Sequence, residues 1–230
     1  MTGDWQSHIV VRDVEAAVSS TRRLLRIARA CGKRIHVLHI STAEEMELLR
    51  DAKDVASVEV LPNHLTLAAP DCYERLKGYA QQNPPVREAH HRDALWRALN
   101  AGIVDVLATD HAPHTIEEKE RPYPASPSGM PGVQTFVPVM LTHVNDGKLS
   151  LQRFVELTSA GPQRVFGLAD KGRIAEGYHA DFTVVDLKRK ETITAEWSKS
   201  KCGWTPFDGF EATGWPVATI VRGGFVMRDG

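Results

Sequence analysis

The sequence lacks the features that mark membrane proteins and nucleic-acid-binding proteins. No apolar run approaches the roughly 20 residues that cross a bilayer, so we expect no membrane partner. The 28 basic and 29 acidic side chains give a formal net charge of -1. No basic arm or stripe stands out in the chain, so we do not expect nucleic acid as a partner.

Cysteine is also scarce, and its placement argues against a disulfide framework. The three residues Cys31, Cys72 and Cys202 are odd in number and far apart in the sequence. We therefore expect reduced thiols in a cytoplasmic protein, each filling core space more often than doing chemistry. The remaining composition, 42% hydrophobic and 25% charged, is ordinary for a globular chain of 230 residues.

Hydrophobic periodicity alternates between strands and helices in the first two thirds of the chain. Apolar β-prone runs predict strands over residues 34–40, 55–61 and 104–110. Helical spacing of apolar residues predicts helices over residues 14–31, 41–49, 70–81 and 88–101. This alternation favours an α/β fold built on a parallel sheet or barrel.

Local signals predict details of three segments. Ser41, with Glu44 three residues later, has the spacing of a capping box at a helix N-terminus. Pro138 falls inside a predicted apolar helix, where it indicates a kink. Residues 116–127 are charged and then proline-bearing, which indicates a mobile loop; its part 117–121 is either a lid over a site or an ordinary solvated loop.

From Gly172 the pattern changes to β-structure. Strands are predicted over residues 181–186, 217–222 and 225–227, with the last two joined at the glycine pair 223–224. We therefore divide the chain into residues 1–171, an α/β body, and residues 172–230, a small β domain.

Polar residues follow each predicted strand of the body. His39 closes the first strand, Asn63 and His64 follow the second, and Asp110 closes the third. Parallel strands bring such residues to one edge of a sheet or one mouth of a barrel, where imidazole and carboxylate groups suit zinc. The residues alone leave alternatives open, because Asp110 could equally cap the following turn and either histidine could be a satisfied core residue.

Five sequence motifs occur one after another along most of the chain. Each motif is weak evidence alone, but the ordered set is specific for one protein family. The motifs are His39-Ile-Ser-Thr42, Asn83-Pro-Pro-Val-Arg87, Thr109-Asp-His-Ala-Pro-His114, Gly129-Met-Pro-Gly-Val-Gln-Thr135 and Gly172-Arg-Ile-Ala-Glu-Gly177 with Ala180-Asp181. The set resembles dihydroorotases of the cyclic amidohydrolase superfamily. Hydantoinases and allantoinases share much of it, but the second and third motifs lean towards dihydroorotase.

The resemblance implies the last strands of a metal-dependent (β/α)8 hydrolase barrel with a small C-terminal β portion. In that family a binuclear zinc site lies at the barrel mouth. His39 would bind one zinc, and Asp110 would bind the other and act as general base and acid on dihydroorotate or N-carbamoyl-aspartate, the small-molecule substrate of pyrimidine biosynthesis. Asn83, His114 and the backbone at Pro131 and Gly132 would hold that substrate.

The sequence departs from the family in one serious respect. The His-x-His pair of the first strand, a bridging lysine or aspartate and a further histidine have no counterpart here. We therefore expect the C-terminal portion of such a protein, one that does not fully hold zinc and is inactive unless a missing N-terminal half is supplied. Expected partners are that half or a second copy in a homo-oligomer. A non-catalytic partner of aspartate transcarbamoylase is the alternative outside the enzyme class.

Overall fold

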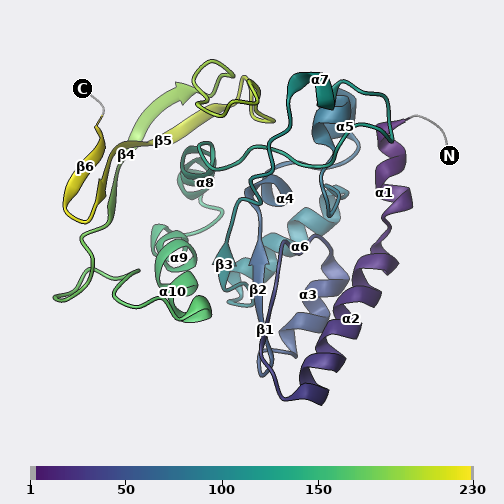
Figure 1. The fold of residues 1–230 in the computed structure, drawn as a ribbon, viewed down its shortest axis with the longest axis horizontal. Helices are drawn as coiled ribbons and strands as arrows, with labels where there is room; N and C mark the ends of the chain where they lie inside the picture. Colours follow the sequence, from purple (N-terminus) through teal and green to yellow (C-terminus); the bar gives the residue numbers. More distant parts are fainter. Residues whose placement is uncertain (1–3, 229–230) are drawn as a thin grey trace.

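The body is built around a parallel β-sheet in the computed structural model, which describes residues 4–228 (Figure 1). Its three strands lie in the order β1-β2-β3, and their bounds are Ile35–Val37, Ala56–Val60 and Val106–Leu107. Ile35 pairs with Ala56, and Glu59 pairs with Val106. The α/β alternation predicted from the sequence is confirmed, although each strand is shorter than predicted.

Helices bury the apolar sides of this sheet. α2 and α3 lie beside β1 and β2, while α9 and α10 lie beside β3 (Figure 1). Val58 and Val60 of β2 are fully buried in a core that also takes in Leu25, Met46 and Leu95 from three helices. The helices of the body are α1 (His8–Val11), α2 (Val14–Cys31), α3 (Ala43–Arg50), α4 (Pro62–Thr66), α5 (Asp71–Leu76), α6 (Ala89–Asn100), α7 (Ile116–Lys119), α8 (Phe136–Asn145), α9 (Leu151–Val155) and α10 (Gly161–Phe166). Short 3-10 or π turns cover η1 (Trp5–Ser7), η2 (Lys77–Ala80) and η3 (Glu156–Ala160).

Helix starts show where local sequence signals succeed and where they miss by a residue. α2 begins as predicted, because the Asp13 side chain accepts a hydrogen bond from the Ala16 amide. For α3 the predicted cap at Ser41 is wrong: Thr42 is the N-cap and accepts from the Glu45 amide. Ser41 is buried, and its hydroxyl lies 3.4 Å from Nε of Arg87, so it serves a tertiary contact instead.

Two further predictions differ from the structure, one about Pro138 and one about the helix over residues 70–81. Pro138 is the third residue of α8, in the first turn, where a helical amide has no intrahelical acceptor and a proline is tolerated. The helix predicted over residues 70–81 is divided into α5 and η2, and Lys77, the first residue of η2, has a φ of 50°. Lys77 adopts a left-handed conformation that ends the α-helical run.

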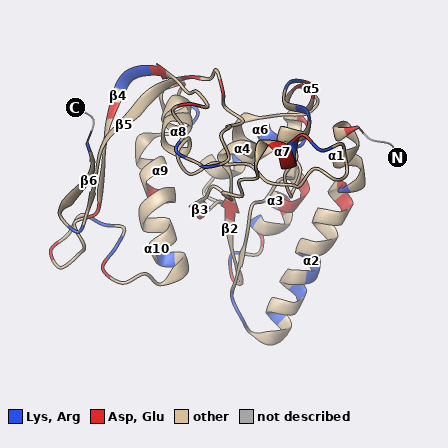
Figure 2. Cartoon of the chain, turned by 45° about the horizontal axis from the view of Figure 1, so that its top comes forward, with Lys and Arg blue, Asp and Glu red and all other residues tan. Residues whose placement is uncertain are grey.

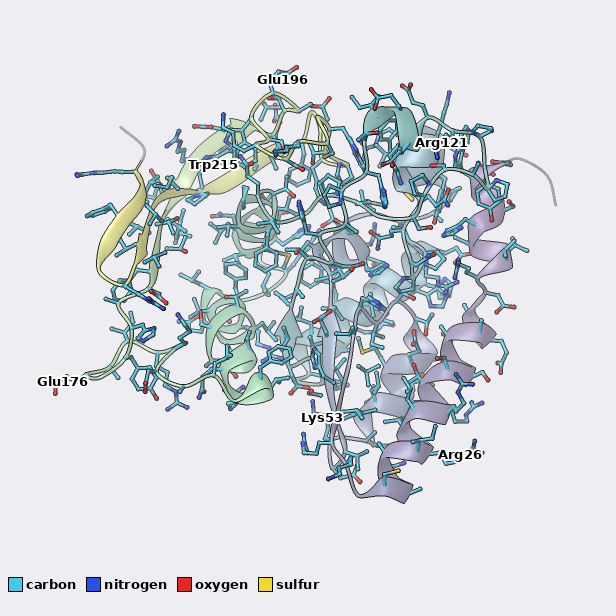
Figure 3. All side chains as sticks on the ribbon, in the orientation of Figure 1. Arg26, Lys53, Arg121, Glu176, Glu196 and Trp215 are labelled. Atoms are coloured by element: carbon cyan, nitrogen blue, oxygen red, sulfur yellow. The ribbon has the colours of Figure 1, made fainter. Side chains whose placement is uncertain are left out.

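The two ends of the sheet differ in character. At the amino end, Lys53 pairs with Asp105, whose carboxylate also accepts from the Val58 amide at 2.8 Å. Figure 3 shows Lys53 at one end of the sheet and Arg121, just beyond α7, at the other. The carboxyl ends of the strands therefore run into the loops that carry α4, α5 and α7.

The C-terminal part forms a second sheet, antiparallel in the order β4-β5-β6. The strands are Phe182–Thr192, Glu211–Val221 and Gly224–Arg228, and the last turn is centred on Arg222 and Gly223, one residue earlier than the predicted glycine pair. The boundary at residues 171–172 stays a prediction. A second apolar cluster crosses it, because Trp204 and Trp215 share a core with Tyr73 and Met130.

Charge is distributed without a single basic face. Figure 2 shows basic residues spread along α2, β4 and α10. Arg22, Arg26 and Arg29 of α2 line a groove of about 960 Å³. Its opposite wall carries Glu44 and Glu47 of α3 and Asp51 just after that helix. Within residues 4–228, no helix has the length and apolar character to span a membrane.

A buried histidine of α8 predicts loss of stability in acid. Nε2 of His143 lies 2.9 Å from the Thr66 hydroxyl, and burial lowers the pKa of His143 to about 3. Because the unfolded chain takes up this proton near pH 6.5, His143 should lower the free energy of unfolding by about 1.4 kcal/mol for each pH unit below 6.5, and His64, whose pKa burial lowers to about 4, should add to this loss. Urea denaturation between pH 4.5 and 7 measures the total slope. His143→Phe should reduce that slope by about 1.4 kcal/mol per pH unit, whereas His179→Gln, at an exposed position, should leave it unchanged.

Candidate functional site

His39 lies two residues beyond β1 in a conformation that is unusual for a side-chain-bearing residue. Its φ is +39°, in the left-handed region, and it is half-buried. Its imidazole makes no hydrogen bond or ion pair to another residue in the range 4–228. The ring is therefore free to bind a ligand at the carboxyl edge of the sheet.

The conformation of His39 is supported by Glu59 of β2. Glu59 is buried, and one carboxylate oxygen accepts the His39 amide at 3.2 Å. The other oxygen lies 3.1 Å from Nε2 of His36, and Nδ1 of His36 lies 2.8 Å from the Ser57 hydroxyl. The chain of contacts from Ser57 to His39 gives His36 a supporting role, because its ring connects Ser57 to the carboxylate that holds the His39 amide.

Removal of the Glu59 carboxylate should release His39. Glu59→Leu should cost about 1–3 kcal/mol in the free energy of unfolding and should speed hydrogen exchange of the His39 amide, because that amide loses its acceptor. Glu59→Gln, which keeps an oxygen acceptor, should retain most of the protection. Urea unfolding and amide exchange by NMR measure both effects; unchanged exchange in Glu59→Leu would contradict the supporting role.

Asp110 occupies the matching place after β3. It lies three residues beyond Leu107, rather than at the strand end as predicted, with a φ of +45°. Its side chain is exposed and has no hydrogen-bond or ion-pair partner among residues 4–228. The two predicted metal ligands thus share three properties: a position just past a parallel strand, a left-handed backbone and an unpaired side chain.

The loop after Asp110 is joined directly to the loop that carries Pro131 and Gly132. Nδ1 of His111 accepts the Gly132 amide at 3.0 Å, and the Ala112 amide donates to Met130 at 3.0 Å. A Cβ on Gly132 would lie 3.1 Å from the Thr109 carbonyl oxygen. The backbone predicted to hold substrate therefore packs against the loop that carries the predicted catalytic residue Asp110.

His114 is held on both sides of its ring. Nδ1 lies 3.4 Å from a Glu118 carboxylate oxygen, and Nε2 lies 3.3 Å from the Ser128 carbonyl. Its own carbonyl accepts Nε1–H of Trp204 at 2.8 Å. These contacts place His114 beside the segment that leads into Pro131.

Asn83, the other predicted substrate contact, is bonded to α1 and, among the residues that the structure describes, not to the loops of Asp110 or Pro131. Its Oδ1 lies 3.1 Å from Nε2 of His8, which also lies 3.0 Å from the Gln82 carbonyl. Burial is the main cause that lowers the pKa of His8. Asn83 therefore faces α1, and within residues 4–228 it makes no hydrogen bond to Asp110 or His39.

Arg87, at the end of the same motif, is buried and donates to the carbonyls of Arg12 and Asp13, at 2.7 and 3.2 Å. It supports the loop through backbone contacts.

A buried polar network, which sequence reasoning did not find, connects these loops. The Asn63 amide donates to Oε1 of Gln82 at 2.8 Å and lies 3.5 Å from the Met130 sulfur. The Gln82 amide nitrogen lies 2.8 Å from Nε2 of His64. Burial lowers the pKa of His64 to about 4, so this ring is neutral near pH 7. The only sequence signal was two adjacent glutamines before the Asn-Pro-Pro motif.

The donor types present fit zinc, but their number does not. His39 and Asp110 supply one imidazole and one carboxylate, whereas a catalytic zinc usually has three protein ligands. In the part of the chain that the structure describes, no group of three or more His, Cys, Asp or Glu residues is arranged to hold a metal. A complete metal site would need further donors.

Comparison with known proteins settles the family. A model of the amidohydrolase family matches residues 6–226. The chain belongs to the amidohydrolase family. Among similar proteins, a dihydroorotase of Pyrococcus furiosus is 41% identical over 218 residues, which covers 93% of this chain and 50% of the relative. A dihydroorotase of Methanosarcina acetivorans is 38% identical over 233 residues, covering 96% of this chain and 50% of the relative.

Solved structures of other amidohydrolases have the same fold. An L-hydantoinase from Arthrobacter aurescens matches with a TM-score of 0.96 and 33% identity, covering 100% of this chain and 52% of that protein. A D-hydantoinase from a Thermus species matches with a TM-score of 0.93 and 27% identity, covering 99% and 52%. This amidohydrolase chain thus spans about half the length of the relatives it matches, and its sheet is a partial α/β barrel.

Proposed function

We propose that this chain supplies the C-terminal half of the active site of a dihydroorotase, which opens dihydroorotate to N-carbamoyl-aspartate and closes it again. The observation that carries the proposal is the matched placement of His39 and Asp110 just past two parallel strands, both left-handed and both unpaired. The similarity to dihydroorotases at about 40% identity supports this substrate over other cyclic amides.

The chain's own residues have distinct tasks in this proposal. The Asp110 carboxylate, exposed and unpaired, can accept a proton from the attacking water and return it to the leaving ring nitrogen. The adjoining Pro131 and Gly132 backbone and His114 would orient the ring and its carboxylate. Left-handed conformations are costly, and residues held in them occur often at functional sites.

Zinc is the metal that His39 and Asp110 would help to hold. When bound, zinc would supply Lewis-acid polarisation of the ring amide carbonyl and a lowered pKa for water. The remaining donors would come from an N-terminal barrel half, which we propose as the partner of this chain, either covalently connected or supplied by another polypeptide.

The runner-up substrate class is hydantoin or allantoin. The observation that favours it is the TM-score of 0.96 with an L-hydantoinase. A non-catalytic role beside aspartate transcarbamoylase is the alternative outside the enzyme class, and the short donor set favours it.

A chimera tests the proposal. The upstream half of the Pyrococcus furiosus dihydroorotase is joined to this chain, and zinc content and hydrolysis of dihydroorotate, hydantoin and allantoin are measured for the chimera and for the chain alone. We expect the chimera to bind zinc and to favour dihydroorotate, and the chain alone to do neither. Faster hydrolysis of hydantoin would select the runner-up. A folded, inactive chimera that copurifies with aspartate transcarbamoylase would select the non-catalytic role. Stoichiometric zinc and turnover by the chain alone would refute the need for a second half.

A further inference from the structure

Lys119 stands out because a lysine is among the largest fully buried side chains of the described residues. Lysine is almost never fully buried without a partner. Here the ammonium group has no carboxylate within ion-pair distance among residues 4–228; its partners are backbone carbonyls. Burial lowers the pKa of Lys119 to about 8, which reflects the cost of removing the charge from water.

We propose that Lys119 is the positioning residue of the substrate-binding loops, because its ammonium group joins the three segments that carry Asn83, His114 and the Pro131–Gly132 backbone. The inference rests on the proposed function, which makes those residues the substrate contacts. It adds a residue that contacts no substrate and acts through the loops.

The three hydrogen bonds of the ammonium reach two of these segments. Nζ donates to the carbonyls of Gln81, Pro127 and Gly129, at 3.0, 2.9 and 3.1 Å. Gln81 lies two residues before Asn83, and Gly129 lies two residues before Pro131. An ammonium has three donors, so all of its hydrogen-bonding capacity is used in joining these loops.

The third segment is the one that carries Lys119 itself. Lys119 ends α7, a single turn that begins after Thr115 with a capping box to Glu118, so its position relative to His114 is fixed. The backbone carbonyl of Lys119 accepts the Ser126 hydroxyl at 3.1 Å. The segment 117–121, for which the sequence left open a lid or an ordinary solvated loop, is therefore anchored from inside by its own lysine.

An aromatic side chain from the C-terminal part covers the ammonium. The Trp204 ring centroid lies 5.6 Å from Nζ of Lys119, within the range of a cation–π contact. The same indole donates to the His114 carbonyl. Trp204 thus contacts both the Lys119 ammonium and the backbone at His114.

The two segments that the ammonium reaches are also bonded to each other near Lys119. The Gly129 amide donates to the Gln81 carbonyl at 2.9 Å, and the Gln81 side chain donates to the Ser126 carbonyl at 2.8 Å. An apolar side chain of the same length could fill the space of Lys119 but would leave its three carbonyls without this donor. The positive charge, rather than the volume, is the part that the loops require.

Hydrogen exchange of the full chain, followed by mass spectrometry, tests the inference. In Lys119→Met we expect exchange to accelerate at least tenfold in residues 78–88 and 120–134, with the sheet and α2 unchanged. Lys119→Arg, which keeps a cationic donor, should restore part of the protection. Lys33→Met, at an exposed lysine, is the matched control and should exchange like the unsubstituted chain.

Two results would overturn the inference. One is unchanged exchange in the two loop segments of Lys119→Met. The other is uniformly faster exchange over the whole chain in both Lys119 variants, which would show a general packing role. Neither depends on catalysis, so an inactive chimera would count against the proposed function alone.

Discussion

Asp110→Asn in the chimera should slow dihydroorotate hydrolysis by about a hundredfold to ten-thousandfold, the range that a positioned general acid–base contributes. The amide cannot accept a proton from water, and it removes a negative charge from the donor set. The side chain has no protein partner among residues 4–228, so its replacement leaves no buried group unpaired. Stability should therefore change by less than about 0.5 kcal/mol, and the loss should appear in kcat.

The matched control is Asp146→Asn, an exposed aspartate just after α8. It should leave kcat within twofold, because it lies outside the site. Steady-state kinetics and urea unfolding of the chimera and both variants separate the two cases. An Asp110→Asn chimera that keeps its kcat would remove Asp110 from the chemistry and leave the fold-level assignment intact.

Gly129→Ala should be among the most destabilising single substitutions at the site. Gly129 has a φ of +148°, and a Cβ there would lie 2.4 Å from the Ala112 carbonyl oxygen and 3.1 Å from Cδ2 of His114. The methyl group must push the loop of Asp110 away from the loop of Pro131. Backbone strain and steric overlap together predict a loss of about 3–5 kcal/mol in the free energy of unfolding.

Gly147→Ala separates these two causes. Gly147 also has a positive φ, +73°, but a Cβ there would contact nothing within 4 Å. It should cost about 1–2 kcal/mol, the penalty of the left-handed conformation alone. Urea denaturation of both variants measures the difference; equal losses would show that the two loops can move apart without cost.

Some features of the fold could be read from the sequence because their causes are local. The apolar spacing after Asp13 and the glycine at residue 32 define α2 at both ends. The segment of residues 56–60, which contains Val58 and Val60, is a buried strand along its whole length. Where a side chain had a choice of partners, local patterns failed: Ser41 contacts Arg87, so the cap of α3 passes to Thr42.

For the candidate site too, some features could be predicted from the sequence and others could not. Motif order was enough to predict the amidohydrolase fold and to select His39 and Asp110, and their shared placement after parallel strands follows from the strand pattern. Their left-handed backbones were not predictable, because these depend on Glu59 and on the loop at Met130, residues remote in the chain.

The sequence by itself determined the alternation of strands and helices and the family, and it selected His39 and Asp110 as candidate metal ligands, since periodicity and motif order are properties of neighbouring residues. Only the tertiary structure decided that the charged segment after Thr115 carries a buried lysine bonded to neighbouring loops. The three carbonyl acceptors of Lys119 lie in two other loops. Because the environment of a buried charge is set by partners remote in the chain, the residues next to Lys119 could not predict it.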